Sequence, residues 1–186
     1  MTDERIHVHE AGHVIVGHVL GLEEPRSVVA ADDGGHTSRF LSPVLLERLD
    51  RPSWLAWVEA DGVMHLAGAA ALRALGYSDP DRGAEGDRPK AWQAAKHLDP
   101  SAPDATLARL RARAVELART HRDAIDRFAA ALALHDGRLD GPEVTSALNR
   151  ALAGEGHTLA TRPPTQAEFL ARLKTYNHPT EQEYPA

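Results

Sequence analysis

The chain has 186 residues, a formal net charge of −6 and no cysteine. Because 42% of its residues are apolar and only 5% are aromatic, its core must be built largely from alanine, leucine and valine, which favours packed helices over sheets. The lack of cysteine excludes disulfides and thiolate ligands, so any metal ion must be held by His, Asp or Glu. The sequence contains no basic stripe, no run of about 18 apolar residues and no GxxxxGK[ST] motif. We therefore expect a cytoplasmic protein that binds neither nucleic acid nor a membrane and has no nucleotide motor of its own.

Helical patterns dominate the chain. The first predicted helix begins near Asp3 and ends at Gly21, a residue type that suits a helix C-terminal cap. Within a second, mostly buried helix, Gly62 and Gly68 would let neighbouring elements approach closely. A short helix is predicted over residues 42–50, and longer ones over residues 53–75, 90–97, 104–133 and 142–152.

One hairpin interrupts the helices. The segments "RSVVA" (26–30) and "HTSRF" (36–40) flank "ADDGG", whose Asp and Gly residues are typical of a turn. The sequence thus predicts a mainly α fold, a helical bundle around the N-terminal helix with one small β-hairpin or edge strand. We expect residues 1–153 to form one domain and residues 154–186 a C-terminal extension, partly flexible, with a short helix over 166–174.

The N-terminal helix carries the string "HEAGH", which starts at His9. Helix positions i and i+4 lie on one face, so His9 and His13 can bind one ion together. This is the HExxH arrangement, in which two imidazoles bind zinc and the glutamate lies beside the water on the ion. Zinc lowers the pKa of that water to about 7, and Glu10 can accept its proton and deliver it to the leaving amine of a cleaved peptide. Val16 and Leu20 continue the same face, which predicts that both imidazoles are buried.

The residues alone leave the third ligand of a catalytic zinc ion open. The extended HExxHxxGxxH pattern fails, because Val16 and Val19 stand where its glycine and third histidine would be. The acidic candidates are Glu59, Asp61 and Asp87. Asp87 lies at the start of a predicted helix after a glycine-rich loop, where a carboxylate is electrostatically favoured, but such a residue can equally be a plain helix cap.

Four blocks of the sequence resemble the peptidase domain of the FtsH-type ATP-dependent zinc metalloproteases. "HEAGH" with the following "VIVGHVLG" is similar to the zinc helix of that family, and "LAGAAALRALG" (66–76) resembles its GGRAAEELIFG helix. "GAEGDRPKAWQAA" (83–95) resembles the TGASNDLxxAT segment that supplies the third zinc ligand, and residues 121–144 resemble the closing region. The blocks stand in the same order as in the family, so the resemblance implies an FtsH-peptidase-like zinc metalloprotease domain over residues 1–153.

The resemblance also implies which residues form the site. Carried over by position, His9, His13 and Asp87 hold one Zn²⁺ ion and Glu10 is the general base. In the family, an edge strand after the zinc helix binds the substrate by β-addition. The residues alone fit a plain hairpin on the helix equally well. The matching candidates for substrate binding are His36, Thr37, Ser38, Arg39 and Phe40.

Two departures from the family pattern limit what can be carried over. The AEE acids are replaced by Ala71, Leu72 and Arg73, so polar support around the ligands is lost or rearranged. The ATPase module and the membrane anchor have no counterpart in this sequence. The resemblance therefore supports the site and the fold rather than motor-driven degradation in a ring-shaped hexamer.

Three functions remain open at the level of the sequence. The first is an ATP-independent zinc endopeptidase that hydrolyses peptides or unfolded protein segments, alone, as a homo-oligomer or with a separate unfoldase. The second is a catalytically inactive peptidase-like module that binds a peptide or a partner protein, for which the replaced AEE acids argue. The third is a HExGH peptidase that cleaves one regulator and uses Glu59 as its third ligand.

Overall fold

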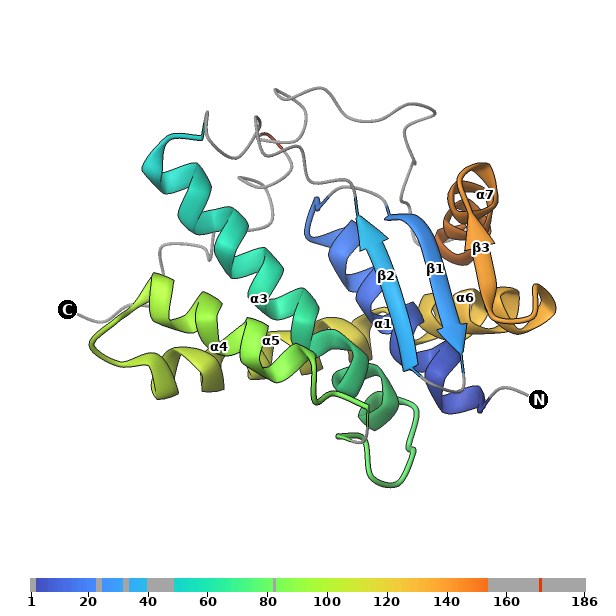
Figure 1. Cartoon of the computed structure of the whole chain (residues 1–186), viewed down its shortest axis with the longest axis horizontal. Coiled ribbons are helices and arrows are strands. Elements are labelled where there is room, and N and C mark those ends of the chain that lie inside the picture. Colours follow the sequence, from blue (N-terminus) through green and yellow to red (C-terminus); the bar gives the residue numbers. More distant parts are fainter. Residues whose placement is uncertain are drawn as a thin grey trace.

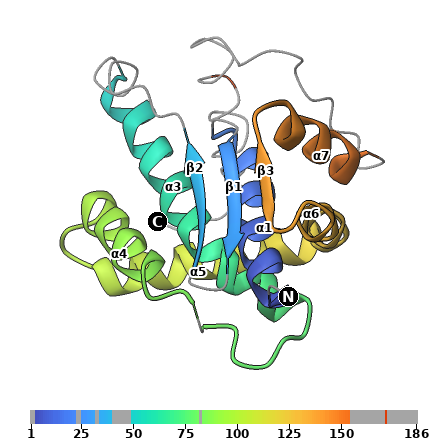
Figure 2. The ribbon, with the colours of Figure 1, turned by 45° about the vertical axis from the view of Figure 1, so that its right-hand side comes forward.

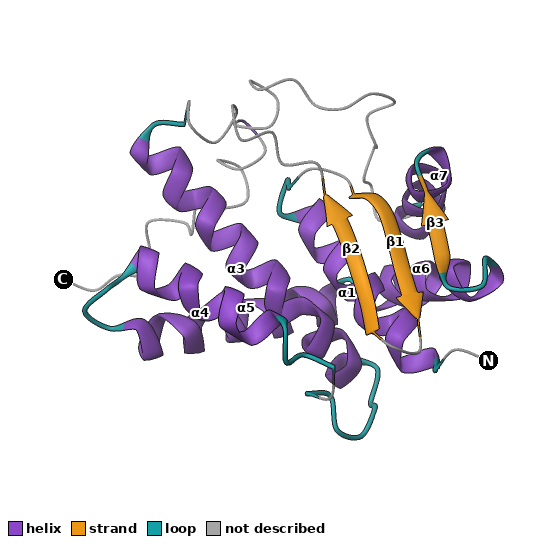
Figure 3. Cartoon of the chain, in the orientation of Figure 1, coloured by secondary structure: helices purple, strands orange, loops and turns teal. Residues whose placement is uncertain are grey.

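The computed structural model describes residues 3–22, 25–31, 34–39, 49–81, 83–153 and 171, and for residues 25 and 34–39 only the backbone is described. This part of the chain holds six helices and three strands, so the fold is mainly helical, as predicted (Figure 3). The expected short helices over 42–50 and 166–174 and the C-terminal extension lie outside the described residues, apart from residues 49, 50 and 171. The helices are α1 (Glu4–Val19), α3 (Arg51–Ala74), α4 (Asp87–Leu98), α5 (Pro103–Thr120), α6 (Arg122–Leu134) and α7 (Pro142–Leu152), and the strands are β1 (Pro25–Ala31), β2 (Gly34–Arg39) and β3 (Arg138–Asp140).

Helix α1 lies at the centre of the molecule. It packs against α3 and α6, and the hairpin of β1 and β2 also contacts it (Figure 1, Figure 2). Every residue from His7 to Gly17 is buried, and Val16 and Leu20 are almost fully enclosed. The predicted burial of the HEAGH face is therefore confirmed, and the bundle is built around this helix.

The ends of α1 follow from local chemistry. The Asp3 side chain caps the N-terminus by accepting a hydrogen bond from the backbone N–H of Arg5. At the other end Gly21 has a φ of +79°, and the N–H of Leu22 donates to the carbonyl of Gly17. This is the glycine-terminated helix end that the sequence predicts.

The sheet has one strand more than the sequence predicts. β1 and β2 form the expected antiparallel hairpin, in which Val28 pairs with Thr37. β3 pairs antiparallel with the other side of β1, which gives the order β2-β1-β3 and leaves β2 at an edge. Three residues are too few to show the alternating pattern of a strand, but Leu139 of β3 is fully buried opposite Val28.

The predicted single helix over 104–133 is wrong, because the chain forms two helices there. α5 ends at Thr120 and α6 begins at Arg122, with the buried His121 between them at φ −105° and ψ 24°. α5 packs mainly against α3, whereas α6 packs mainly against α1. No glycine or proline stands at the break, so it follows from tertiary packing rather than from a local signal.

The remaining helices lie close to their predicted bounds. α3 begins two residues before the predicted start, and α7 matches its prediction. α4 begins at Asp87 rather than at residue 90, which places this carboxylate in the first turn of the helix. None of the described helices is long and apolar enough to span a bilayer.

A candidate metal centre between helices α1 and α4

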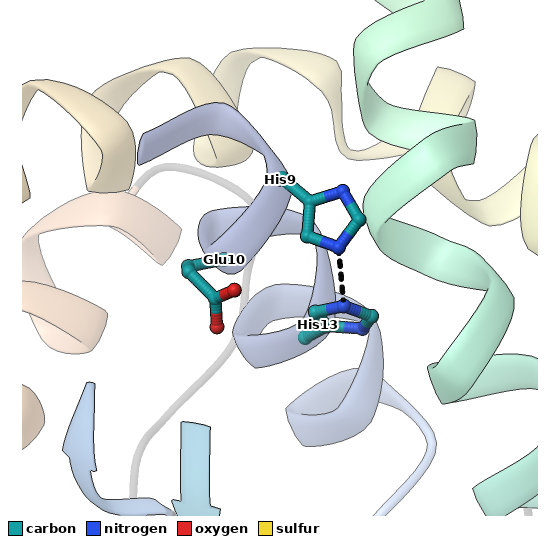
Figure 4. Close-up of side chains that lie close together, drawn as sticks. All are labelled: His9, Glu10 and His13. Carbon is teal, nitrogen blue, oxygen red and sulfur yellow. Dashed lines mark hydrogen bonds between the residues drawn. The ribbon is translucent and has the colours of Figure 1, made fainter. Parts of the chain in front are cut away.

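His9 and His13 lie side by side on the face of α1 that is turned toward α3. Their Nε2 atoms are 3.0 Å apart, and their rings meet edge to face with centroids 4.7 Å apart (Figure 4). Both side chains are buried, with 7% and 5% of their residues' surface exposed. The helical i, i+4 spacing therefore brings two imidazoles together in a site largely shielded from water.

Asp87 completes this pair from a distant part of the chain. Its Oδ2 atom lies 3.2 Å from Nε2 of His9 and 3.1 Å from Nε2 of His13. Two nitrogens and one oxygen thus form a nearly equilateral triangle supplied by α1 and α4. The other acidic candidates lie elsewhere: the Glu59 carboxylate binds the guanidinium of Arg109, and Asp61 contacts His65.

The tautomer of His13 is fixed by a hydrogen bond from its Nδ1 atom to the backbone of Met64. Nδ1 lies 2.8 Å from the backbone carbonyl of Met64, and a carbonyl can only accept, so Nδ1 carries a proton and donates it. In neutral His13 the lone pair is then on Nε2, which points toward His9 and Asp87. The structure thus presents His13 in the form that a metal ligand requires.

The charges and hydrogen bonds around His13 and Asp87 favour a positive charge between them. Burial lowers the pKa of His13, but the hydrogen bond with Asp87 and the negative charges of Asp87 and Glu10 outweigh it, so this pKa is raised. Burial raises the pKa of Asp87, but hydrogen bonds with His13, His65 and His9 hold it well below the ordinary range. In the metal-free protein the Asp87 carboxylate therefore favours the protonated form of His13. The same cluster would attract a cation.

The three donor atoms fit a zinc ion. Ligand atoms at about 2.0–2.1 Å from a tetrahedral zinc ion lie roughly 3.3 Å from one another, and the separations here are 3.0, 3.1 and 3.2 Å. Two imidazoles and one carboxylate are also a donor set that catalytic zinc sites use, with one position left open. The residues that would hold the ion are therefore His9, His13 and Asp87.

Glu10 follows His9 in the chain but lies on a different flank of α1. Figure 4 shows its side chain turned away from α3, whereas both imidazoles face α3. One carboxylate oxygen and a ring nitrogen of each histidine all lie within 4.8 Å of one another. The Glu10 residue is only 3% exposed. A buried carboxylate at this range from the two imidazoles is placed to accept a proton at the edge of the site.

Close contact between α1 and α3 holds the imidazoles in place. A Cβ on Gly68 of α3 would lie 2.5 Å from the ring of His9, so the ring rests directly on the α3 backbone. A Cβ on Gly12 would lie 2.6 Å from the carbonyl oxygen of Ala67. We expected the small size of Gly68 to serve helix packing, and the structure adds that it makes room for a site residue.

Only one of the two glycines just before α4 is required by the backbone conformation. Gly83 has a φ of +89°, which favours glycine. Gly86 has an ordinary φ of −77° and open space where a Cβ would be, so its small size is not needed there. The turn that brings Asp87 to the site therefore depends on Gly83 and not on Gly86.

His65 was missed by sequence reasoning, and Asp61, an acidic candidate for the third ligand, contacts it instead of the two imidazoles. Nδ1 of His65 lies 3.5 Å from Oδ1 of Asp87, and its Nε2 lies 3.5 Å from Oδ2 of Asp61. Burial lowers the pKa of His65, but the contacts with Asp61 and Asp87 outweigh it and raise this pKa. The i, i+4 spacing of Asp61 and His65 was the available signal, but nothing in the sequence connects this pair to α4.

The strand that we expect to bind substrate is described only as backbone. Residues 36–39 lie in β2, at the edge of the sheet, and their side chains are outside the described part of the structure, as is all of Phe40. Ala71 and Leu72, which replace two acids of the resembled family, are buried in the core, and Arg73 is exposed near Asp81. The polar groups that contact the triangle are the Met64 carbonyl, which faces His13, and the His65 ring, which faces Asp87.

Comparison with known proteins identifies no family. No protein-family model matches the chain, and no curated protein matches it.

Proposed function

We propose that this chain is a zinc-dependent endopeptidase that hydrolyses peptides or unfolded protein segments without an ATPase motor of its own. The observation that carries the proposal is the convergence of His9, His13 and Asp87 from two helices far apart in sequence. The sequence blocks that resemble FtsH-type peptidases support it, because the same three positions are the ligands there. Glu10 lies beside this triangle, as the HExxH mechanism requires.

The residue types at the site indicate the role that each group would have in peptide hydrolysis. His9, His13 and Asp87 would hold a zinc ion that, when bound, would supply a Lewis acid for the attacking water and the scissile carbonyl. The Glu10 carboxylate accepts the proton of the attacking water and then delivers it to the leaving amine. The N–H of His13 stays on Nδ1 because Met64 accepts it, so this imidazole keeps its other nitrogen available throughout the reaction.

The edge position of β2 supports a way to bind extended substrate. An edge strand presents unpaired backbone groups, and a peptide that pairs with it adopts the extended form that an endopeptidase cleaves. We propose that residues 36–40 serve this role. A segment that is buried in a folded protein is not free to pair with this edge, so the proposed substrates are peptides or unfolded segments, delivered where needed by a separate unfoldase.

A second candidate is a module that binds peptides without cleaving them. The replacement of the family's AEE acids by Ala71, Leu72 and Arg73 favours it, because acids near a metal site commonly tune its ligands. In this case the same edge of β2 would bind a peptide or a partner protein, and the metal ion would be structural.

A digestion assay separates the two candidates. The purified protein is incubated with casein or a fluorogenic peptide, with and without a chelator, alongside the variant Glu10→Gln. The proposal predicts cleavage that requires zinc and falls by at least about 100-fold in Glu10→Gln, the scale on which a lost general base acts, while the variant still binds zinc. Zinc binding without cleavage in the wild type would support the binding module, and unchanged cleavage by Glu10→Gln would contradict the mechanism.

A further inference from the structure

One turn of helix α3 contacts each of the three candidate metal ligands. Met64 accepts the hydrogen bond of His13, and Gly68 supports the ring of His9. The third contact is made by His65, whose Nδ1 atom lies 3.5 Å from Oδ1 of Asp87. We infer that His65, held by Asp61, is a positioning residue that orients Asp87 toward the metal ion. The inference rests on the proposed metal site.

The two oxygens of Asp87 have separate partners. Oδ2 faces the imidazoles of His9 and His13, whereas Oδ1 faces His65 at 3.5 Å and Lys90 at 3.9 Å. The Lys90 side chain is 61% exposed, so water and salt screen its attraction to the carboxylate, whereas the His65 side chain is only 16% exposed. His65 is therefore the partner that can fix the rotation of this carboxylate.

Asp61 fixes His65 in turn. It precedes His65 by one helical turn on α3, and its Oδ2 atom lies 3.5 Å from Nε2 of the ring. Each ring nitrogen thus faces a carboxylate, which leaves the imidazole one favourable orientation. Asp61 and His65 are both on the long, well-packed helix α3. The helix that fixes the His65 ring therefore also supports His9 and His13.

Asp87 needs such support because it stands at an uncapped helix start beside a small cavity. It is the first residue of α4, and no side chain caps this helix terminus. A cavity of about 20 Å³ adjoins it, lined in part by His65, Ala84 and Arg88. This volume holds about one water molecule. Without the His65 imidazole, the carboxylate could turn toward this space and lose its alignment with His9 and His13.

Loss of the His65 contacts should lower the affinity for zinc, and any loss of activity should follow from this. Hydrogen-bonded partners behind metal ligands typically contribute 10- to 100-fold to affinity, because they hold the ligand in the geometry that binding requires. The two contacts of His65 are long, at 3.5 Å, so we expect an effect at the lower end of this range, about 10-fold.

The test compares zinc affinities measured by competition with a chelator. His65→Leu keeps most of the side-chain volume but removes the donor, whereas His65→Asn keeps a donor near the position of Nδ1. His135→Ala is the control, because His135 is an exposed histidine at the end of α6. The absorption spectrum of the Co²⁺-loaded proteins reports the coordination geometry independently of activity, and the thermal midpoint of each metal-free variant shows that it folds.

The inference predicts that His65→Leu binds zinc about 10-fold more weakly, with an altered Co²⁺ spectrum, while His65→Asn recovers most of the affinity and His135→Ala matches the wild type. Asp61→Asn tests the same chain of contacts if His65→Leu does not fold, and it too should weaken zinc binding. The inference would be overturned if His65→Leu and Asp61→Asn both bound zinc as tightly as the wild type. It would also be overturned if His65→Leu and His65→Asn lost the same amount of zinc affinity. In either case the proposed function stands. A wild-type protein that binds no zinc would overturn both, and zinc binding without peptidase activity would remove the proposed function alone.

Discussion

The imidazole of His9 rests on the backbone of Gly68. A Cβ atom at Gly68 would lie 2.5 Å from the ring, closer than any side chain can approach. The contact is matched one turn away, where Gly12 of α1 faces the backbone of Ala67. Helices α1 and α3 thus meet through one glycine on each, and this crossing holds the first candidate ligand in place.

Adding one methyl group at Gly68 should therefore disturb the site directly. We expect Gly68→Ala to displace the His9 ring, to weaken zinc binding and to lower the free energy of unfolding by about 1–3 kcal/mol, as overpacking of a core does. Gly86→Ala is the control, because Gly86 has a φ of −77° and open space around it. Zinc titration and urea unfolding of both variants test this, and equal behaviour of the two would contradict the role given to Gly68.

Much of the fold could be predicted because its signals are local. The spacing of His9 and His13, the Asp3 cap and the positive φ at Gly21 are all properties of a few neighbouring residues. The hairpin was predicted from its turn residues in the same way. Such features do not depend on how the helices are arranged, so sequence reasoning reaches them.

The features that were missed depend on tertiary contacts. The break at His121 has no glycine or proline to mark it and follows from α5 and α6 packing on different helices. The residues alone could not choose between Glu59, Asp61 and Asp87, because only the crossing of α3 and α4 decides which carboxylate meets the histidines. Asp87 was predicted from the resemblance, and the role of His65 from neither source.

The stability of the metal-free protein should depend on pH through His13 and Asp87. The raised pKa of His13 means that its contribution is fully present below its ordinary value of 6.5 and is lost as pH rises through the folded value. The lowered pKa of Asp87 means that its contribution is present above about 3.9 and is lost only in stronger acid. We expect this pair to stabilise the metal-free protein most between about pH 4 and 6.5.

Zinc binding should show the opposite trend, because zinc and the proton compete for Nε2 of His13. Urea unfolding with a chelator present, from pH 5 to 9, should therefore show stability falling as His13 deprotonates, while zinc affinity rises over the same interval. In Asp87→Asn the difference between low and high pH should shrink. If the stability of the metal-free protein rose from pH 6 to 8, and rose equally in the wild type and in Asp87→Asn, the assignment of this pair would be contradicted.

Gly137 should be essential for docking β3 against β1. It has a φ of +79°, and a Cβ there would lie 2.2 Å from the backbone oxygen of Ala30. Gly76 has a similar φ of +84° but nothing near the position of a Cβ, so it isolates the cost of the backbone conformation. We expect Gly76→Ala to cost about 1 kcal/mol and Gly137→Ala to cost clearly more. Thermal unfolding of the two variants measures the difference, and equal costs would show that the β3 contact is unimportant.

The central claim is that His9, His13 and Asp87 together hold one metal ion. The most direct measurement is the zinc content of the purified protein after dialysis, for the wild type, Asp87→Ala and Glu59→Ala. We predict one zinc ion per chain in the wild type and in Glu59→Ala, whose carboxylate binds Arg109 instead, and a loss of bound zinc in Asp87→Ala. Full zinc occupancy in Asp87→Ala, or loss of zinc in Glu59→Ala alone, would contradict the account.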